Sequence, residues 1–489
     1  MAFRLFGDGL NGLFRSLSVG VQMISVRQVM ESRNVAVIGA SQDPEKPGAL
    51  VLKVLKDTGF QGQVAGVNPR GGEVHGMPLY HSLDEIPFPV DLAVLIIPPK
   101  AVPPSLAECA SQGVKGVVIS SEGFAETGEE GKRYQEEVRS ILRSTGMRGF
   151  GPNTMGIVNT ATGLTTSYFA SKRMLQPGPI GFASQSGIFL GALMRYLTSF
   201  EPFRISKVLG LGNKVDVDES DALSYLIKDE QTRIVGMYLE DIRDGRRFLD
   251  VARKGVVQKP VLLLKGGRTP TGSRATASHT ASLAVDDAVL NGALRQAGVL
   301  RMADMDELLS TIMGFQCMPL PKGERLAFVT YSGAQAIMSM DVAADEGLKV
   351  AHLSKEAQKR IASVIAMPNK AQNPVDVFPD MMAYGFEKTA TEILHALLDD
   401  DGVHGIVFIS FATYGPDPYR PLVEVIRNRL TKPIFFALLG DKNKVAACRE
   451  LMEQNGIPFY MFPEMAIRVF AHMWRYARTL KGARGGRSS

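Results

Sequence analysis

The sequence predicts an α/β protein made of three consecutive doubly wound domains. The chain has 489 residues, which is too long for one ordinary hydrophobic core. Short apolar runs alternate along it with segments whose apolar residues recur at helical spacing, and its 49 glycines suit tight turns between them. This alternation is typical of parallel sheets that helices cover on both faces.

The first domain is expected over residues 34–157. Asn34–Gly39 is predicted as a buried strand that runs into a glycine-rich turn, after which helical spacing appears. The further strands are predicted at 63–67, 92–97 and 114–120, and the helices at 50–55, 101–112 and 132–144.

The second domain is expected over residues 158–313 and the third over 324–480. Both begin alike, with a strand, a Ser-Gly pair within a few residues and then a helix. The strands are predicted at 179–183, 206–211, 234–239 and 261–265, then at 325–330, 405–410 and 433–437, with a helix at 334–345. The segment 314–323, which contains two prolines, is predicted as a linker.

The two ends of the chain lie outside these domains. Residues 1–33 carry four arginines and only two acids, a composition found in transit peptides. A non-native extension, or a true start at Met23 or Met30, explains the same segment equally well. Residues 481–489 form a basic tail.

Composition narrows the classes of partner. The net charge of +5 is spread over the whole length, so no nucleic acid partner is expected. The sequence contains no run of about eighteen apolar residues, so no membrane span is predicted. Cys109, Cys317 and Cys448 lie far apart, so neither a disulfide framework nor a metal site is expected, and a cytoplasmic location is favoured.

The turn after the first strand is a candidate phosphate site. Gly39, Ala40 and Ser41 open this turn and Lys46 lies just before the helix, where backbone N–H groups would face an anion. The spacing matches neither the dinucleotide fingerprint nor the Walker A loop. The alternative is that these residues form a tight turn that binds no ligand.

The ends of the next strands favour a ligand with several phosphates. Asn68 and Arg70 stand where an NAD site would carry an acid for the ribose. Ile97 and Pro98 lead to a further lysine, and Glu122 follows the next strand. Because arginine prefers a phosphate at such a position, coenzyme A (CoA) fits better than NAD. The alternative is that these cations are ordinary solvated charges on the surface and bind no ligand.

A second anion site is predicted where the second domain begins. Ser184, Gln185, Ser186 and Gly187 open a helix, so N–H groups and hydroxyls are available to a phosphoryl group. Asn153, on a stiff turn at the end of the first domain, could hydrogen-bond a thioester or a carboxylate. Helix capping by the serines and an Asx turn at Asn153 are the alternatives.

His279 is the candidate carrier of a covalent phosphoryl group. Small and hydroxyl-bearing residues surround it over 274–284, so reagents can approach its imidazole from more than one side. A carboxylate beside it would fix its tautomer and stabilise its charged form. Glu240, at the very end of a buried strand, is better placed for this than the acidic run 216–221, which a capped helix start also explains.

Taken together, these stretches resemble the alpha subunit of the NDP-forming acyl-CoA synthetases, relatives of succinyl-CoA synthetase. The resemblance runs from about Asn34 to Leu480. It rests on ordered motifs, among them Val35–Ser41, Gly151-Pro152-Asn153, Ser184–Gly187, Gly212-Asn213-Lys214, Tyr238-Leu239-Glu240, Ser278-His279-Thr280 and Asn373-Pro374-Val375-Asp376.

The resemblance implies a Rossmann-like CoA-binding domain followed by two flavodoxin-like domains of the succinyl-CoA-ligase type. It also implies an acetate–CoA ligase (ADP-forming) activity, acyl-CoA + ADP + phosphate ⇌ acid + CoA + ATP. The reaction would pass through an acyl phosphate and a phosphohistidine at His279, which Glu240 supports. A separate ATP-grasp beta subunit would bind ADP or ATP and Mg²⁺ in an α2β2 heterotetramer, because no length remains here for a grasp domain.

Two departures from the family pattern leave an alternative open. Ala281 and Val285 stand where the family usually has glycine, and the third domain opens with Thr330–Ala334 in place of Thr-Asn-x-Gly-Gly. A CoA or acyl-CoA sensor without turnover is therefore the second hypothesis. An NAD oxidoreductase is disfavoured by the broken glycine fingerprint. The residues that select the acid are expected among 163–168, Phe189 and the turn 121–126.

Overall fold

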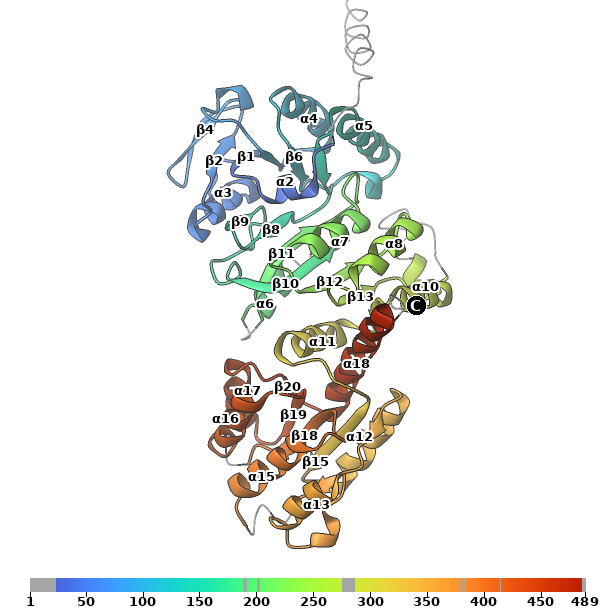
Figure 1. Cartoon of the computed structure of the whole chain (residues 1–489). Helices are drawn as coiled ribbons and strands as arrows, with labels where there is room; N and C mark the ends of the chain where they lie inside the picture. The colour runs from blue at the N-terminus through green and yellow to red at the C-terminus, as the bar shows by residue number, and fades with distance from the viewer. Residues whose placement is uncertain are drawn as a thin grey trace, which may run out of the picture. The chain divides into compact units, whose positions relative to one another are not determined.

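The computed structural model describes residues 23–187, 191–199, 203–274, 286–378, 380, 384–413 and 415–485. Its strands form three sheets in which parallel pairs dominate, and helices follow most strands along the chain (Figure 1). The predicted fold class, α/β with three successive doubly wound units, is confirmed.

The first sheet has the strand order β3-β4-β2-β1-β5-β6-β7. Each residue of β5 and of β6 is buried, as expected for central parallel strands. The elements are β1 (Asn34–Ile38), α3 (Pro47–Thr58), β2 (Gln63–Val67), β3 (Gly72–Val74), β4 (Met77–Tyr80), η1 (Leu83–Glu85), β5 (Leu92–Leu95), η2 (Pro99–Ala101), α4 (Val102–Ser111), β6 (Gly116–Ile119), η3 (Ala125–Thr127), α5 (Glu129–Thr145) and β7 (Arg148–Phe150).

The second sheet has the order β14-β13-β12-β10-β11-β8-β9. Its core strands are parallel, while β8 runs antiparallel to β11 and β9 antiparallel to β8. The elements are β8 (Ile157–Asn159), β9 (Leu164–Thr165), β10 (Pro177–Ser184), α6 (Ala192–Leu197), β11 (Ile205–Gly210), α7 (Glu219–Lys228), β12 (Ile234–Leu239), α8 (Gly245–Gly255), β13 (Val261–Lys265), α10 (Asp287–Ala297) and β14 (Leu300–Met302).

The third sheet has the order β16-β15-β18-β19-β20, and β17 pairs with β15. Aliphatic and phenylalanine side chains from these strands and their helices form its hydrophobic core. The elements are α11 (Met305–Cys317), β15 (Arg325–Thr330), α12 (Gly333–Asp345), β16 (Lys349–Val350), α13 (Lys355–Ala362), η5 (Pro368–Lys370), β17 (Val375–Asp376), α15 (Phe386–Asp399), β18 (Gly405–Phe411), η6 (Asp417–Tyr419), α16 (Arg420–Arg429), β19 (Ile434–Leu439), α17 (Lys442–Gln454), β20 (Phe459–Tyr460) and α18 (Pro463–Gly485).

Helix α11 runs into the segment that the sequence predicts as a linker. Gly314 does not break this helix, because it is buried where α11 packs against α18. A Cβ at Gly314 would lie 2.3 Å from Val469 Cγ1, so the glycine permits a close helix–helix approach. Tyr460 Oη also donates to Ser310 O at 3.1 Å. Helix α18 continues to Gly485, into the predicted basic tail.

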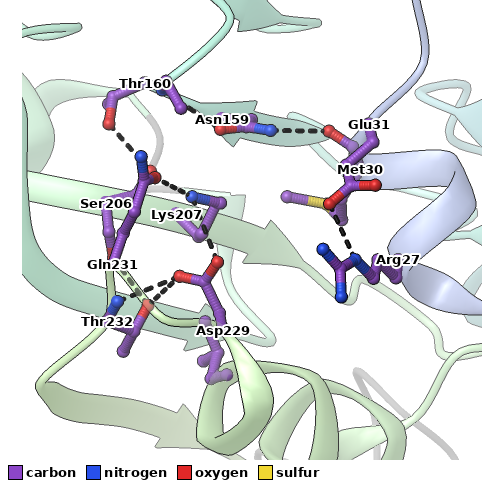
Figure 2. A network of polar contacts seen from close by, with 12 residues as sticks. Arg27, Met30, Glu31, Asn159, Thr160, Ser206, Lys207, Asp229, Gln231 and Thr232 are labelled. Atoms are coloured by element: carbon purple, nitrogen blue, oxygen red, sulfur yellow. Dashed lines mark hydrogen bonds and ion pairs between the residues drawn. The ribbon is translucent and has the colours of Figure 1, made fainter.

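A short helix, α2 (Val26–Met30), lies inside the predicted N-terminal extension. Ser25 and Gln28 cap it reciprocally, and Val29 and Met30 are fully buried. Ile24 N donates to Gly146 O at 3.0 Å, and Asn159 Nδ2 donates to Met30 O at 2.8 Å (Figure 2). Residues 24–30 are therefore attached to both the first and the second domain.

The chain divides into two compact units. The first comprises residues 1–199, 204–259 and 265–297, and the second comprises 200–203, 260–264 and 298–489. The first two predicted domains thus fall largely within one unit. Among the helices that the structure describes, none is long and apolar enough to cross a membrane.

Candidate functional site

The turn after β1 packs closely against the end of the neighbouring strand β5. Gly39 has φ +92, and a Cβ there would lie 2.2 Å from Ile96 O. Gly39 N donates to Val67 O at 3.0 Å, which fixes the turn beside the end of β2. Only glycine fits this position, so the turn that the sequence singles out has both the conformation and the close packing that glycine permits.

Asn68 joins the ends of the first two strands. Its Nδ2 donates to Ala40 O at 2.7 Å, and its Oδ1 accepts from Arg70 N at 2.9 Å. The Ser41 hydroxyl accepts from Asp43 N at 3.0 Å, a local turn contact. Lys46 and Arg70 are exposed at this edge of the sheet. Two exposed cations beside a glycine turn suit a phosphate-bearing ligand.

The ends of β5 and β6 are linked in the same way. Ile97 N donates to Ser121 Oγ at 3.2 Å, while Pro98 and Glu122 are exposed. Asn153 N donates to Ser121 O at 2.9 Å, and Asn153 has φ 57, a left-handed conformation that asparagine tolerates better than most residues. The turn at Asn153 therefore lies beside the turn that carries Glu122.

The loop after β11 connects the first two domains. Asn213 N donates to Pro152 O at 2.9 Å, and a Cβ at Gly212 would lie 2.2 Å from the same oxygen. The Asn213 side chain donates to Glu126 Oε2 at 2.7 Å. Glu126 in turn accepts from Gly123 N at 2.8 Å, so this loop holds the 121–126 turn in place.

Gln185 connects the end of β10 to the end of β12. Its Oε1 accepts from Glu240 N at 2.9 Å and from Asp241 N at 3.2 Å, and its Nε2 donates to Asp241 Oδ1 at 2.6 Å. Ser184 Oγ donates to Ser186 O at 2.8 Å, so this hydroxyl serves the turn. The Gln185 amide thereby orients the backbone that carries Glu240.

A buried lysine, which the sequence pattern did not single out as a site residue, stabilises this arrangement. The Lys214 side chain is 1% exposed and contacts Glu219 Oε2 at 2.9 Å and Asp241 Oδ1 at 2.6 Å. Glu219 is fully buried and also accepts from Arg243 N at 2.7 Å. Lys214 and Glu219 lie close together in the sequence, but nothing in the sequence pattern indicated that Asp241, much further along the chain, would contact this lysine.

Glu240 sits half-buried at the end of β12. Tyr238 Oη donates to Glu240 Oε1 at 3.4 Å, and burial followed by the nearby Glu240 charge raises the pKa of Tyr238 to about 12. Lys265 Nζ donates to the Glu240 carbonyl at 2.7 Å. A Cβ at Gly266 would lie 3.6 Å from Glu240 Cγ, so the strand end leading toward residue 274 adjoins Glu240.

The acidic run 216–221 has a structural role. Asp218 accepts from Ser220 N and Asp221 N and so caps α7. Asp216 contacts Arg148 Nε at 2.8 Å, and Asp221 contacts Arg148 Nη2 at 2.6 Å. The cap agrees with the alternative of a capped helix start, but the acids of this run are largely buried and ion-paired rather than solvated.

A cavity of about 620 Å³ lies where the two domains of the first unit meet. Its wall joins strand-end residues of the first domain to two aromatic side chains of the second, together with Gly187 and Gly191. The lining residues are Pro47, Ile96, Ser120, Glu122, Asn153, Thr154, Met155, Tyr168, Phe169, Gly187 and Gly191.

Three of the predicted site residues, Glu122, Asn153 and Gly187, meet in this cavity. The others lie outside its lining: Gly39, Ala40, Ser41, Lys46, Asn68, Arg70, Ile97, Pro98, Ser184, Gln185, Ser186 and Glu240. Tyr168, from the segment expected to select the acid, lines the wall, and its ring lies 4.4 Å from that of Phe169. His279 and Phe189 lie outside the described residues.

Comparisons with known proteins identify the family of the chain. A CoA binding domain family matches residues 33–160, and the succinyl-CoA ligase like flavodoxin domain family matches residues 177–315. A solved structure of the dinucleotide forming acetyl-coenzyme A synthetase 1 of Candidatus Korarchaeum cryptofilum, in complex with phosphate and ADP, has a TM-score of 0.86 and 29% identity. That match covers 94% of this chain and 99% of the other.

Two curated relatives are more similar in sequence. Acetate–CoA ligase [ADP-forming] II of Archaeoglobus fulgidus is 38% identical over 93% of this chain and 67% of its own length. The subunit alpha of acetate–CoA ligase [ADP-forming] II of Pyrococcus furiosus is 38% identical over 93% of this chain and 98% of its own. The chain therefore belongs to the family of ADP-forming acetate–CoA ligases and corresponds to their alpha subunit.

Proposed function

We propose that this chain is the subunit of an ADP-forming acid–CoA ligase that binds CoA and the acid and carries the phosphoryl group on His279. The reaction is acyl-CoA + ADP + phosphate ⇌ acid + CoA + ATP. The observation that carries the proposal is the cavity in which Glu122, Asn153 and Gly187 meet, since it joins the ligand edges of two parallel sheets.

CoA is assigned to the edge of the first sheet. The backbone at Gly39, Ala40 and Ser41 and the exposed Lys46 and Arg70 would hold its phosphates. We assign four further residues to the CoA site, because they follow neighbouring strands at the same edge: Asn68, Ile97, Pro98 and Glu122. Asn153 would hydrogen-bond the thioester carbonyl there and favour attack at its carbon.

The phosphoryl group moves in balanced steps. A phosphate oxygen attacks the thioester carbon, the C–S bond breaks, and CoA leaves as a thiol after taking a proton. A nitrogen of His279 then attacks the phosphorus of the acyl phosphate, and the carboxylate leaves. The backbone N–H groups of the 184–187 turn would bind the phosphoryl oxygens, and Glu240 would stabilise the charged imidazole.

The last transfer, from His279 to ADP, is assigned to a partner. An ATP-grasp beta subunit would bind ADP or ATP with Mg²⁺, in an α2β2 assembly. The three cysteines are unpaired, which supports a reducing compartment, and we place the reaction in the cytoplasm.

Labelling tests the carrier residue. The chain with its beta partner, incubated with ATP labelled in its γ-phosphate, is expected to acquire an acid-labile, alkali-stable phosphate. His279→Ala should abolish the label, whereas His81→Ala, at an exposed histidine paired with Glu85, should keep it. Glu240→Gln should retain the backbone contact to Gln185 yet lower turnover by about 10²-fold or more. A wild-type level of label in His279→Ala would exclude the proposal.

A CoA or acyl-CoA sensor is the second candidate. Ala281 and Val285, in place of the usual glycines beside His279, favour it. Calorimetry with CoA, together with an assay in the presence of the beta partner, separates the two functions. CoA binding without turnover is the expected result for a sensor, and any turnover that depends on His279 rules it out.

A further inference from the structure

A second and larger cavity, of about 830 Å³, lies elsewhere in the first unit. It forms where α2 and the end strand β7 of the first domain face β11, α7 and α8 of the second. It shares no lining residue with the cavity assigned to the acyl group. Lys207 lines it from the first half of β11, a strand that contributes no residue to the lining of the acyl cavity.

The wall of this cavity carries more positive than negative side chains. Among its lining residues, six are cationic and four are acidic: Arg27, Arg33, Arg148, Lys207, Lys228 and Arg247 against Glu31, Asp221, Asp229 and Glu230. Four of the cations form ion pairs with carboxylates. Arg33 and Lys228 form none with the residues that the structure describes, so these are the two cations of the wall whose charge is not already paired with a carboxylate.

Lys207 is an unusual feature of this wall, because lysine is rarely buried. It lies in the fully buried strand β11, and its ammonium group contacts Gln231 Oε1 and, at 3.4 Å, Asp229 Oδ1 (Figure 2). Burial lowers the pKa of Lys207, although Asp229 opposes this shift. Asp229 is held in turn by Thr232 Oγ1 at 2.7 Å.

Hydroxyl and amide groups complete the wall. Ser25, Ser224 and Thr162 supply hydroxyls, and Gln231 and Asn159 supply amides. The volume falls within the range of about 300–1,000 Å³ that is usual for small-molecule sites, which occur preferentially at domain interfaces. Arginine together with lysine and hydroxyl donors is the donor set that recognises phosphate groups.

We propose that this cavity is a binding site for a small phosphorylated metabolite, separate from the site of CoA and the acid. The side chains of Arg33 and Lys228, which form no ion pair with the described residues, bind the phosphate oxygens. Lys207, paired with Asp229, borders the ligand from the cavity wall. The site needs no turnover to be occupied, so it stands or falls independently of the proposed ligase activity.

Calorimetry of the full chain with inorganic pyrophosphate tests this site. The chain is first saturated with CoA, so that the probe cannot occupy the CoA phosphate positions. Pyrophosphate is expected to bind, and the double variant Arg33→Glu/Lys228→Glu is expected to weaken this binding at least tenfold. Both side chains are exposed, so the variant should fold.

A matched control separates a local effect from a change in net charge. Arg143→Glu/Lys254→Glu alters the net charge equally at two exposed residues outside the cavity lining, and it should leave pyrophosphate binding unchanged. The proposal is overturned if pyrophosphate does not bind, or if both double variants bind it equally well. Binding of citrate without binding of pyrophosphate would also overturn it, because the site would then select carboxylates.

Discussion

At the scale of single residues, Lys214 anchors the strand end that carries Glu240. Its ammonium group lies between two carboxylates, and one of these, Asp241, bonds the Gln185 amide that orients Glu240. Lys214 and Glu219 are buried and Asp241 is largely so, which leaves water little room to replace a lost partner. In such surroundings, breaking one ion pair costs far more than the same pair is worth at a surface.

Lys214→Met is expected to destabilise the protein by about 3–5 kcal/mol, because two carboxylates lose their buried cation. Urea unfolding followed by circular dichroism measures the change. Lys132→Met, which removes an exposed lysine paired with Glu129, is the control and should cost no more than about 1 kcal/mol. Equal losses in the two variants would refute the assigned role of Lys214.

The sequence predicted part of this site and missed the rest for a physical reason. Glu240 was predicted as a site residue because an acid at the end of a buried parallel strand must lie at the ligand edge of the sheet. Asp241 and Lys214 were not paired in advance, because their contact depends on a loop in which Gly212 and Lys214 both have positive φ. Nothing in a linear pattern of charges specifies that loop conformation.

At the scale of elements, the long central parallel strands were predicted closely. Apolar runs such as Gln63–Val67, Ile234–Leu239 and Arg325–Thr330 coincide with β2, β12 and β15. The antiparallel strands β8 and β9 were not predicted, nor were parallel strands such as β14 and β16, because each has only two or three residues. Short edge strands depend on tertiary pairing, which periodicity does not report.

The packing of α11 against α18 gives a prediction at this scale. Gly314→Ala would place a Cβ 2.3 Å from Val469 Cγ1, so the helices must separate, and we expect a loss of about 1–3 kcal/mol. In α10, by contrast, a Cβ added at Gly292 would meet no heavy atom within 4 Å, and Gly292→Ala should gain about 0.5–1 kcal/mol. Thermal unfolding of both variants checks the opposite signs, and a neutral Gly314→Ala would contradict the close approach.

At the scale of the whole molecule, the charge balance favours anionic ligands. The chain carries a net charge of +5, and the proposed CoA site contributes the exposed Lys46 and Arg70. Salt screens exposed charges, since the Debye length falls from about 30 Å at 0.01 M to about 10 Å at 0.1 M ionic strength. Long-range attraction of CoA should therefore depend on salt.

CoA affinity is expected to fall several-fold as ionic strength rises over this range. Lys46→Ala/Arg70→Ala should weaken binding at low salt and flatten the dependence, because the charges that salt screens are gone. Titration calorimetry at four salt concentrations measures both effects. Arg143→Ala/Lys254→Ala lowers the net charge equally and should preserve the slope, whereas identical slopes in all three proteins would reject the assigned phosphate contacts.

The buried cluster of Lys214, Glu219 and Asp241 also restricts how this protein can diverge. Loss of Lys214 alone leaves two carboxylates in the interior without their cation, so this intermediate is destabilised, whereas loss of one acid leaves a one-to-one ion pair. The lysine should therefore be retained as long as the acids are. Lineages that lose the lysine should have lost both acids as well, and the loop that depends on them should differ in its backbone course.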